Sequence, residues 1–183
     1  MSRIAVLLVL LLGPLAASAG PIAEQFATGW GGISFGTSLT NLIGTLPGGD
    51  QYFSTAPGHR VYTVRSDEPI LGVPRNGTRV QYHLDAEGNV GAIGIGIPYE
   101  RRDQLLGAMV SLLGPYRGTA AAGISTDYYW APDRGIFVNV RSSTSPVNGI
   151  LEVWIATANT VREAQLRRRC PPGSAPAAPV PKT

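Results

Sequence analysis

Few residues of this chain belong to the types that perform catalysis or bind metals. It has two histidines, His59 and His83, and one cysteine, Cys170. The histidines lie 24 residues apart, and the chain has no HxH, HxxxH or CxxC spacing that would hold a metal ion. Cys170 borders a proline-rich tail, where an ordered site for a thiol nucleophile is not expected. The sequence therefore predicts no metal, no cofactor and no nucleophilic site.

Carboxylates are the remaining candidates for acid–base chemistry. Asp127, Asp133 and Glu152 could meet across strands as an acid–base pair. Asp133 is explained better by a turn of sequence APDRG, however, and Glu152 by the solvated face of a strand. Because no constellation of residues selects a reaction, we predict that the protein is not an enzyme and has no catalytic residues.

A glycine-rich run at 91–96, GAIGIG, has the composition of a nucleotide-binding loop but not its context. Its glycines alternate within a predicted strand, whereas a phosphate-binding loop follows a strand and leads into a helix. We expect Ala92, Gly94 and Gly96 to form a flat strip that another element or a partner can approach closely.

The composition describes a folded chain with little charge. Of 183 residues, 44% are hydrophobic and 15% are charged, which excludes a chain that is disordered throughout. One cysteine excludes an intramolecular disulfide framework. The net charge of +3 belongs to the ends, since residues 20–161 hold nine arginines against eleven acidic residues. The one basic cluster is Arg167–Arg169, so no nucleic-acid partner is expected.

The first residues predict export. Arg3 precedes an unbroken apolar run at 4–12, and Ala17-Ser18-Ala19 offers the small residues that a signal peptidase recognises, so cleavage is expected before Gly20. The apolar stretch is shorter than the roughly 20 residues that a spanning helix needs, and no later stretch is long enough. We therefore expect a periplasmic or secreted protein with no transmembrane segment in the mature chain.

Hydrophobic periodicity predicts an α+β fold of two tandem helix-plus-three-strand units, which form a mainly antiparallel sheet with helices on one face. Ser38 can cap the first helix, and Gly114-Pro115 ends the second, so that the helix stops LIGTLPGG and MVSLLGPY lie at corresponding places. The expected divisions are a signal peptide (1–19), a first unit with an N-terminal segment (20–97), a second unit (98–158), a short helix (159–169) and a disordered proline-rich tail (170–183). The expected strands are Tyr62–Val64, Thr78–Leu84, Val90–Ile97, Thr126–Trp130, Ile136–Arg141 and Ile150–Ala156.

The run ISFGTSLTNLIGTLPGG at 33–49 joins a glycine, hydroxyl residues and a short helix to a Leu/Gly/Pro stop. It resembles the opening of small bacterial envelope domains of the SmpA/OmlA type, and two such units in tandem resemble the β-lactamase inhibitor protein architecture. The resemblance implies a non-enzymatic protein that assists outer-membrane assembly or grips another protein with a sheet surface. One cysteine cannot supply the disulfides of the inhibitor family, and the lipidated N-terminal cysteine of the envelope lipoproteins is absent. Inhibition of a lactamase is therefore not implied.

Strand alternation divides the predicted sheet into an aliphatic face and a face rich in arginine and aromatic residues. For the segment at 126–130 the register is open, and it adds either Asp127 and Tyr129 or Tyr128 and Trp130 to the second face. Mixed aromatic and arginine side chains are typical of protein-recognition surfaces. The candidate contact residues are Arg79, His83, Tyr129, Phe137, Arg141 and Trp154.

The alternative for this face is that another part of the chain covers it. The N-terminal segment around Phe26, Trp30 and Phe35, or the loop at Tyr52-Phe53, carries enough apolar area to do so. The sequence leaves the two arrangements open.

We predict a non-enzymatic exported module that binds another envelope or secreted protein through the aromatic and arginine face. The alternative is a carrier that holds an apolar small molecule or a lipid in a cavity between helices and sheet. A structural envelope component is a third hypothesis. A second copy of the chain, linked through Cys170 in a disulfide-bonded dimer, is an alternative partner.

Overall fold

The computed structural model describes residues 21–53, 60–143 and 149–162 of the chain. The predicted signal peptide, the predicted disordered tail, Cys170 and His59 lie outside the described residues. Residues 158–162 are helical, whereas the rest of the predicted helix at 159–169 also lies outside them.

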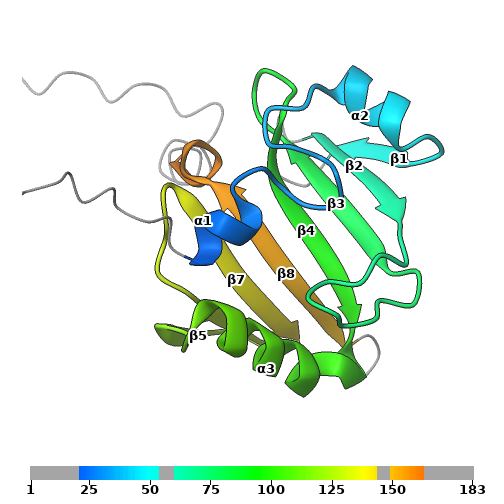
Figure 1. The fold of residues 1–183 in the computed structure, drawn as a ribbon. Helices are drawn as coiled ribbons and strands as arrows, with labels where there is room; N and C mark the ends of the chain where they lie inside the picture. Colours follow the sequence, from blue (N-terminus) through cyan, green and yellow to red (C-terminus); the bar gives the residue numbers. More distant parts are fainter. Residues whose placement is uncertain (1–20, 54–59, 144–148, 163–183) are drawn as a thin grey trace, which may run out of the picture.

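Eight strands form one sheet in which every neighbouring pair is antiparallel, in the order β1-β2-β3-β4-β8-β7-β6-β5 (Figure 1). Strands β4 and β8 lie side by side at its centre, and β1 and β5 form its edges. The strands are β1 (Asp50–Phe53), β2 (Arg60–Arg65), β3 (Arg79–Leu84), β4 (Val90–Pro98), β5 (Gly118–Ala122), β6 (Ser125–Tyr129), β7 (Ile136–Ser143) and β8 (Ile150–Thr157).

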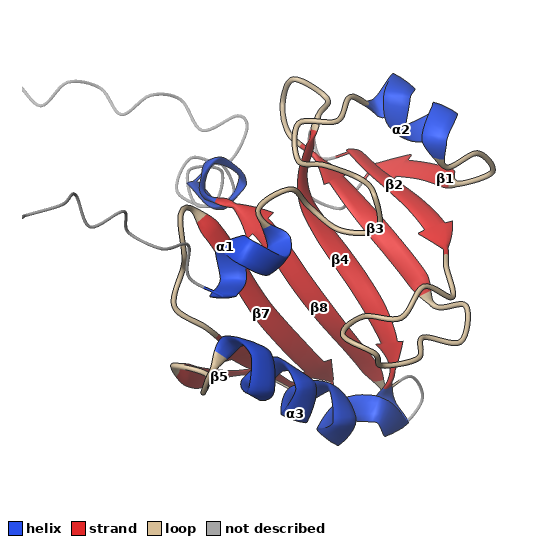
Figure 2. Ribbon diagram, viewed as in Figure 1, coloured by secondary structure: helices blue, strands red, loops and turns tan. Residues whose placement is uncertain are grey.

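The predicted α+β fold of two tandem helix-plus-three-strand units is wrong. The described residues form a mostly-β structure, with one continuous sheet and a few short helices (Figure 2). The two halves of the chain are not separate units, because β4 pairs with β8 over seven residue pairs and one hydrophobic core runs across both. Strands β1 and β5 were missed, since β5 has the sequence GTAAA and lacks the branched and aromatic residues that mark a strand.

The helices pack on one side of this sheet, as Figure 1 shows for α1, α2 and α3. They are α1 (Pro21–Phe26), α2 (Leu39–Thr45) and α3 (Arg102–Leu113), with a 3-10 turn, η1 (Tyr99–Arg101), before α3. Ser38 caps α2, as predicted, and accepts a hydrogen bond from the backbone N–H of Asn41. The indole of Trp130, the residue after β6, donates to the carbonyl oxygen of Gly114 at 2.8 Å, which ties the end of β6 to the end of α3.

The core lies between these helices and the aliphatic face of the sheet. Phe26 of α1, Leu42 of α2 and Met109 of α3 are fully buried in the same cluster as the strand residues. Alternation along each strand places its branched side chains on this face. The strand residues of the core include Val80, Tyr82, Leu84, Ile93, Ile95, Ile97, Val138, Val140, Leu151, Val153 and Ile155.

A buried arginine closes one end of the sheet, where β4 continues beyond the start of β3. The last β3–β4 pair is Val80 with Ile95, so the next carbonyl on β4, that of Gly96, has no partner on β3. Arg75 supplies one, since its Nε donates to the Gly96 oxygen at 3.0 Å, and the hydroxyl of Thr78 donates to the same oxygen. Burial of this carbonyl is therefore compensated by side chains.

The same guanidinium organises the loop between β2 and β3. Its Nη2 donates to the carbonyl oxygens of Thr78 and Arg79, each at 3.0 Å, and its Cζ lies 5.2 Å from the centroid of the Trp30 ring. Burial lowers the pKa of Arg75, while Tyr82, Glu68 and Asp67 oppose the shift. Arginine keeps its charge in proteins, so a cation is held here by carbonyl dipoles and an aromatic face.

Replacing Arg75 should therefore destabilise the fold. We expect Arg75→Ala to lower the free energy of unfolding by roughly 3 kcal/mol or more, because three partly buried carbonyl oxygens lose a charged donor. Arg75→Lys should recover only part of this loss, because an ammonium group cannot reproduce the planar fork. Urea unfolding would measure both variants.

Arg60→Ala is the matched control, since Arg60 is an exposed arginine on β2. We expect its effect to stay within about 0.5 kcal/mol. Equal unfolding free energies for Arg75→Ala and Arg60→Ala would contradict the role assigned to the buried guanidinium.

Candidate protein-binding face of the sheet

The structure places all six predicted contact residues on the sheet face that is opposite the helices. We call it the open face and define it by the outward residues of β3, β6, β7 and β8. These are Arg79, Gln81 and His83 on β3, Asp127 and Tyr129 on β6, Phe137, Asn139 and Arg141 on β7, and Glu152 and Trp154 on β8. Their strand neighbours on the other face are the buried core residues.

The register of the strands brings these residues into rows. One row runs Gln81, Gly94, Trp154, Asn139 and Tyr129 from β3 to β6. Predicted residues that are up to 75 positions apart in the chain, such as Arg79 and Trp154, thus share one surface.

The second row is charged. It passes from Arg79 on β3 over Gly96 on β4 to Glu152, Arg141 and Asp127 on the following strands. Opposite charges in this row alternate between β8, β7 and β6, which is the favourable arrangement for cross-strand neighbours.

The register also settles which residues of β6 belong to this face. Asp127 faces Arg141 and Tyr129 faces Asn139, so these two point away from the core. Tyr128 and Trp130 are buried on the helix side, where Arg102 donates a hydrogen bond to the hydroxyl of Tyr128 at 2.7 Å.

The N-terminal segment does not cover the open face. Phe26 and Trp30 lie on the helix-bearing side, where Phe26 is fully buried and Trp30 stacks on Arg75. Phe35 packs against the same core. The covering arrangement proposed for this segment is therefore wrong.

The strip of small residues on β4 gives the open face its shape. A Cβ atom on Gly94 would lie 2.6 Å from Oε1 of Glu152 and 3.3 Å from the Trp154 ring, so both side chains lie across the bare strand. Trp154 also meets the ring of His83 from β3 in an edge contact, with centroids 4.4 Å apart. Gly94 is therefore approached closely by two side chains of the neighbouring strand β8, those of Glu152 and Trp154.

Exposure varies across the open face. Tyr129 is 43% exposed, and Arg79 and Arg141 are also exposed, whereas the rings of Phe137 and Trp154 are half-buried. Further along the same face, Val61 and Thr63 of β2 are buried. The accessible part of the face thus extends from β3 to β6 and is marked by arginine and tyrosine.

One ion pair is built into this surface. Arg141 binds Asp127 with both ends of its guanidinium, Nε to Oδ1 at 2.8 Å and Nη2 to Oδ2 at 3.1 Å. Glu152 lies on the other side of Arg141. Burial raises the pKa of Glu152, with Arg141 opposing the shift and Asp127 adding to it. The carboxylate of Glu152 is therefore held in an environment that disfavours its charge.

Sequence reasoning missed Arg65, the last residue of β2. It lies directly opposite Arg79, but the strand predicted from the sequence ended at Val64. Continued alternation from Val61 through Thr63 was the signal that could have found it. His83, by contrast, was expected as a contact residue and instead packs against Trp154.

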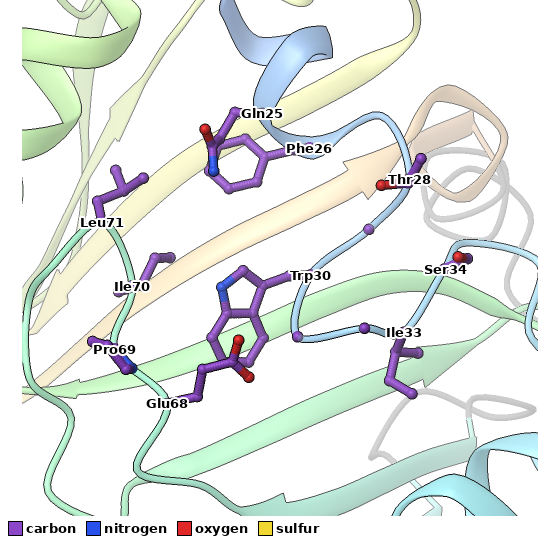
Figure 3. A pocket seen from close by; sticks show the side chains of 13 residues that line it. Gln25, Phe26, Thr28, Trp30, Ile33, Ser34, Glu68, Pro69, Ile70 and Leu71 are labelled. Carbon is purple, nitrogen blue, oxygen red and sulfur yellow. The ribbon is translucent and has the colours of Figure 1, made fainter.

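Two cavities lie on the helix-bearing side, where the carrier hypothesis expects one. The first has a volume of about 410 Å³, and Figure 3 shows Trp30 projecting toward Glu68 and Ile70 of the β2–β3 loop. Burial, then the charge of Glu68, raises the pKa of nearby Tyr82 to about 12, against the effect of Arg75. The second, about 460 Å³, lies between the start of α1 and the end of α3.

Both volumes lie at the lower end of small-molecule sites. The space between α3 and the sheet is filled, since Leu105, Met109 and Ile95 have no exposed surface. Among the described residues, no group of three or more His, Cys, Asp or Glu side chains could hold a metal ion.

The raised pKa of Glu152 predicts a pH dependence of stability. In the unfolded chain its carboxyl has the ordinary pKa of about 4.3. Ionising Glu152 therefore costs more free energy in the folded state than in the unfolded state. The cost is absent at low pH, grows as the pH rises through the unfolded value, and is complete above the folded value. Relative to wild type, Glu152→Gln should gain unfolding free energy as the pH rises from about 3 to about 7.

Urea unfolding at a series of pH values would test this. Glu24→Gln replaces an exposed carboxylate on α1 and is the control. A difference between wild type and Glu152→Gln that stays constant with pH, or that grows as the pH falls, would contradict the assignment.

Comparisons with known proteins assign no family to this chain. No family model, curated protein or solved structure matches it. The resemblance of residues 33–49 to envelope domains and to the inhibitor family stays a prediction. Within the described ranges, no helix is long and apolar enough to cross a membrane, and the single cysteine of the chain excludes an internal disulfide.

Proposed function

We propose that this protein is a non-enzymatic binding module that is exported and recognises another envelope or secreted protein through the open face. The observation that carries the proposal is the co-location of Arg79, Tyr129, Arg141 and Trp154 on one sheet face, opposite the side on which the described helices α1, α2 and α3 pack. Arginine, tyrosine and tryptophan are the residues in which binding energy at protein interfaces concentrates.

The side chains of this face are already held in place, which favours binding. Trp154 is fixed by its contact with His83 and by the bare strand beneath it. Arg141 is fixed by its two hydrogen bonds to Asp127. A partner that binds here loses little side-chain entropy in ordering these groups, so more of the contact energy contributes to affinity.

Chemistry supports binding over catalysis. The carboxylates of the open face are either paired, as Asp127 is with Arg141, or packed between neighbours, as Glu152 is. The prediction that the chain is exported rests on residues 1–19. An exported protein meets its partner outside the cytoplasm, which favours an envelope or secreted protein. The resemblance to sheet-surface inhibitors and envelope-assembly proteins agrees with this function.

Tyr129 allows a direct test with a matched control. Tyr129 on the open face and Tyr116 on the helix-bearing side are 43% and 42% exposed. We expect Tyr129→Ala to reduce the capture of the partner from envelope extract about tenfold or more, as for an aromatic anchor, and Tyr116→Ala to leave capture unchanged. Immobilised wild type and variants would be compared by quantitative mass spectrometry of the retained proteins.

Circular dichroism and thermal unfolding should show that both variants keep the fold. Undiminished capture by folded Tyr129→Ala together with folded Arg141→Ala would rule out the open face as the binding surface. Loss of capture in Tyr116→Ala alone would move the binding surface to the helix-bearing side, where the two cavities lie.

A further inference from the structure

The open face has an excess of positive charge at one end, and this end identifies the chemistry of the partner. Resting on the proposed protein-binding function, we propose that an acidic, extended segment of the partner lies on the open face, with one of its carboxylates bound between Arg65 and Arg79.

These two arginines oppose each other directly across β2 and β3. Both are exposed, and like charges in this position repel. The ion pairs among the described residues join Arg141 to Asp127 and Arg102 to Asp103, and no described carboxylate lies within 4 Å of Arg65 or Arg79. The pair is therefore an uncompensated charge cluster, which a bound anion would relieve.

A groove lies beside this pair. Its volume is about 350 Å³, its floor is Gly96, and Arg79 and Glu152 stand on either side of it. Arg65 reaches its edge and is oriented by a hydrogen bond from Nη1 to the carbonyl oxygen of Gly77 at 3.2 Å. A Cβ atom at position 96 would lie 3.0 Å from the carbonyl oxygen of Arg79, so the backbone there would have to shift slightly to accept a side chain.

The charges around the groove favour a carboxylate over other anions. The two guanidinium groups and the one carboxylate of Glu152 leave a single net positive charge at the groove, which one carboxylate neutralises and a doubly charged phosphate exceeds. Nucleic acids and anionic membranes are attracted by many cations together, whereas residues 20–161 hold nine arginines against eleven acidic residues. Two arginines beside a flat surface with Trp154 and Tyr129 fit a polypeptide that brings a few acidic side chains.

The test uses a short synthetic peptide in which Glu and Ala alternate, and a second in which Gln replaces Glu. Binding to the full chain is measured by fluorescence anisotropy at about 50 mM and about 300 mM NaCl. We expect the wild type to bind the Glu peptide, and to bind it more weakly at the higher salt concentration. Its affinity for the Gln peptide should be lower by at least about tenfold. The double variant Arg65→Gln/Arg79→Gln should lose about tenfold in affinity for the Glu peptide.

Arg60→Gln is the matched control, because Arg60 is an exposed arginine of the same strand on the other face. It should leave the affinity for the Glu peptide within about twofold, as for a charge outside the interface. Circular dichroism verifies that all variants keep the fold.

Three results would overturn the inference: equal binding of both peptides by wild type, unchanged affinity in the double variant, or an equal loss in Arg60→Gln. Binding of inorganic phosphate or of phosphatidylglycerol vesicles without binding of the Glu peptide would overturn it as well. The proposed function fails separately. If Tyr129→Ala loses partner capture while the arginine double variant retains it, the open face binds a protein whose contact segment is not acidic.

Discussion

The end of β4 requires a donor that no strand supplies, and the structure provides it with a buried cation. Beyond Ile95 the pairing of β4 with β3 has ended, so the carbonyl of Gly96 depends on Arg75 and Thr78. The other end of the guanidinium bonds the carbonyls that lead into β3, and its flat face meets Trp30. One side chain thus fixes the central strand, the β2–β3 loop and the segment after α1. A buried charge is tolerated because dipoles and a π face surround it.

The same strand determines what the other side of the sheet can do. Because the outward residues of β4 between Ala92 and Gly96 are the small residues Ala92, Gly94 and Gly96, Trp154 and His83 can meet across it, and Glu152 can lie over it. Where no side chain crosses, at Gly96, the groove remains. The rigid aromatic centre and the charged groove are therefore two consequences of one glycine-rich strand, and the proposed binding surface needs both.

Charge is distributed unevenly on this surface, and the distribution separates structural from functional arginines. Arg75 is buried and bonded to carbonyls, and Arg141 is paired with Asp127, so the bonds of both are formed within the chain. Arg65 and Arg79 are exposed, opposed and without a described carboxylate nearby. An arginine whose partners lie within the fold contributes to its stability, whereas a repelling pair at a groove contributes to recognition.

Local patterns in the sequence determined which side chains share a face, because alternation along a strand and caps at a helix depend only on nearby residues. They placed Arg79, Phe137, Arg141 and Trp154 together and identified Ser38 as a cap. Only the tertiary structure decided that β4 pairs with β8 in one mostly-β sheet, that GTAAA is an edge strand, that the N-terminal segment packs on the helix side, and that Arg65 faces Arg79. These are pairings between distant segments, and no local periodicity encodes which edges meet or which buried carbonyl needs a donor.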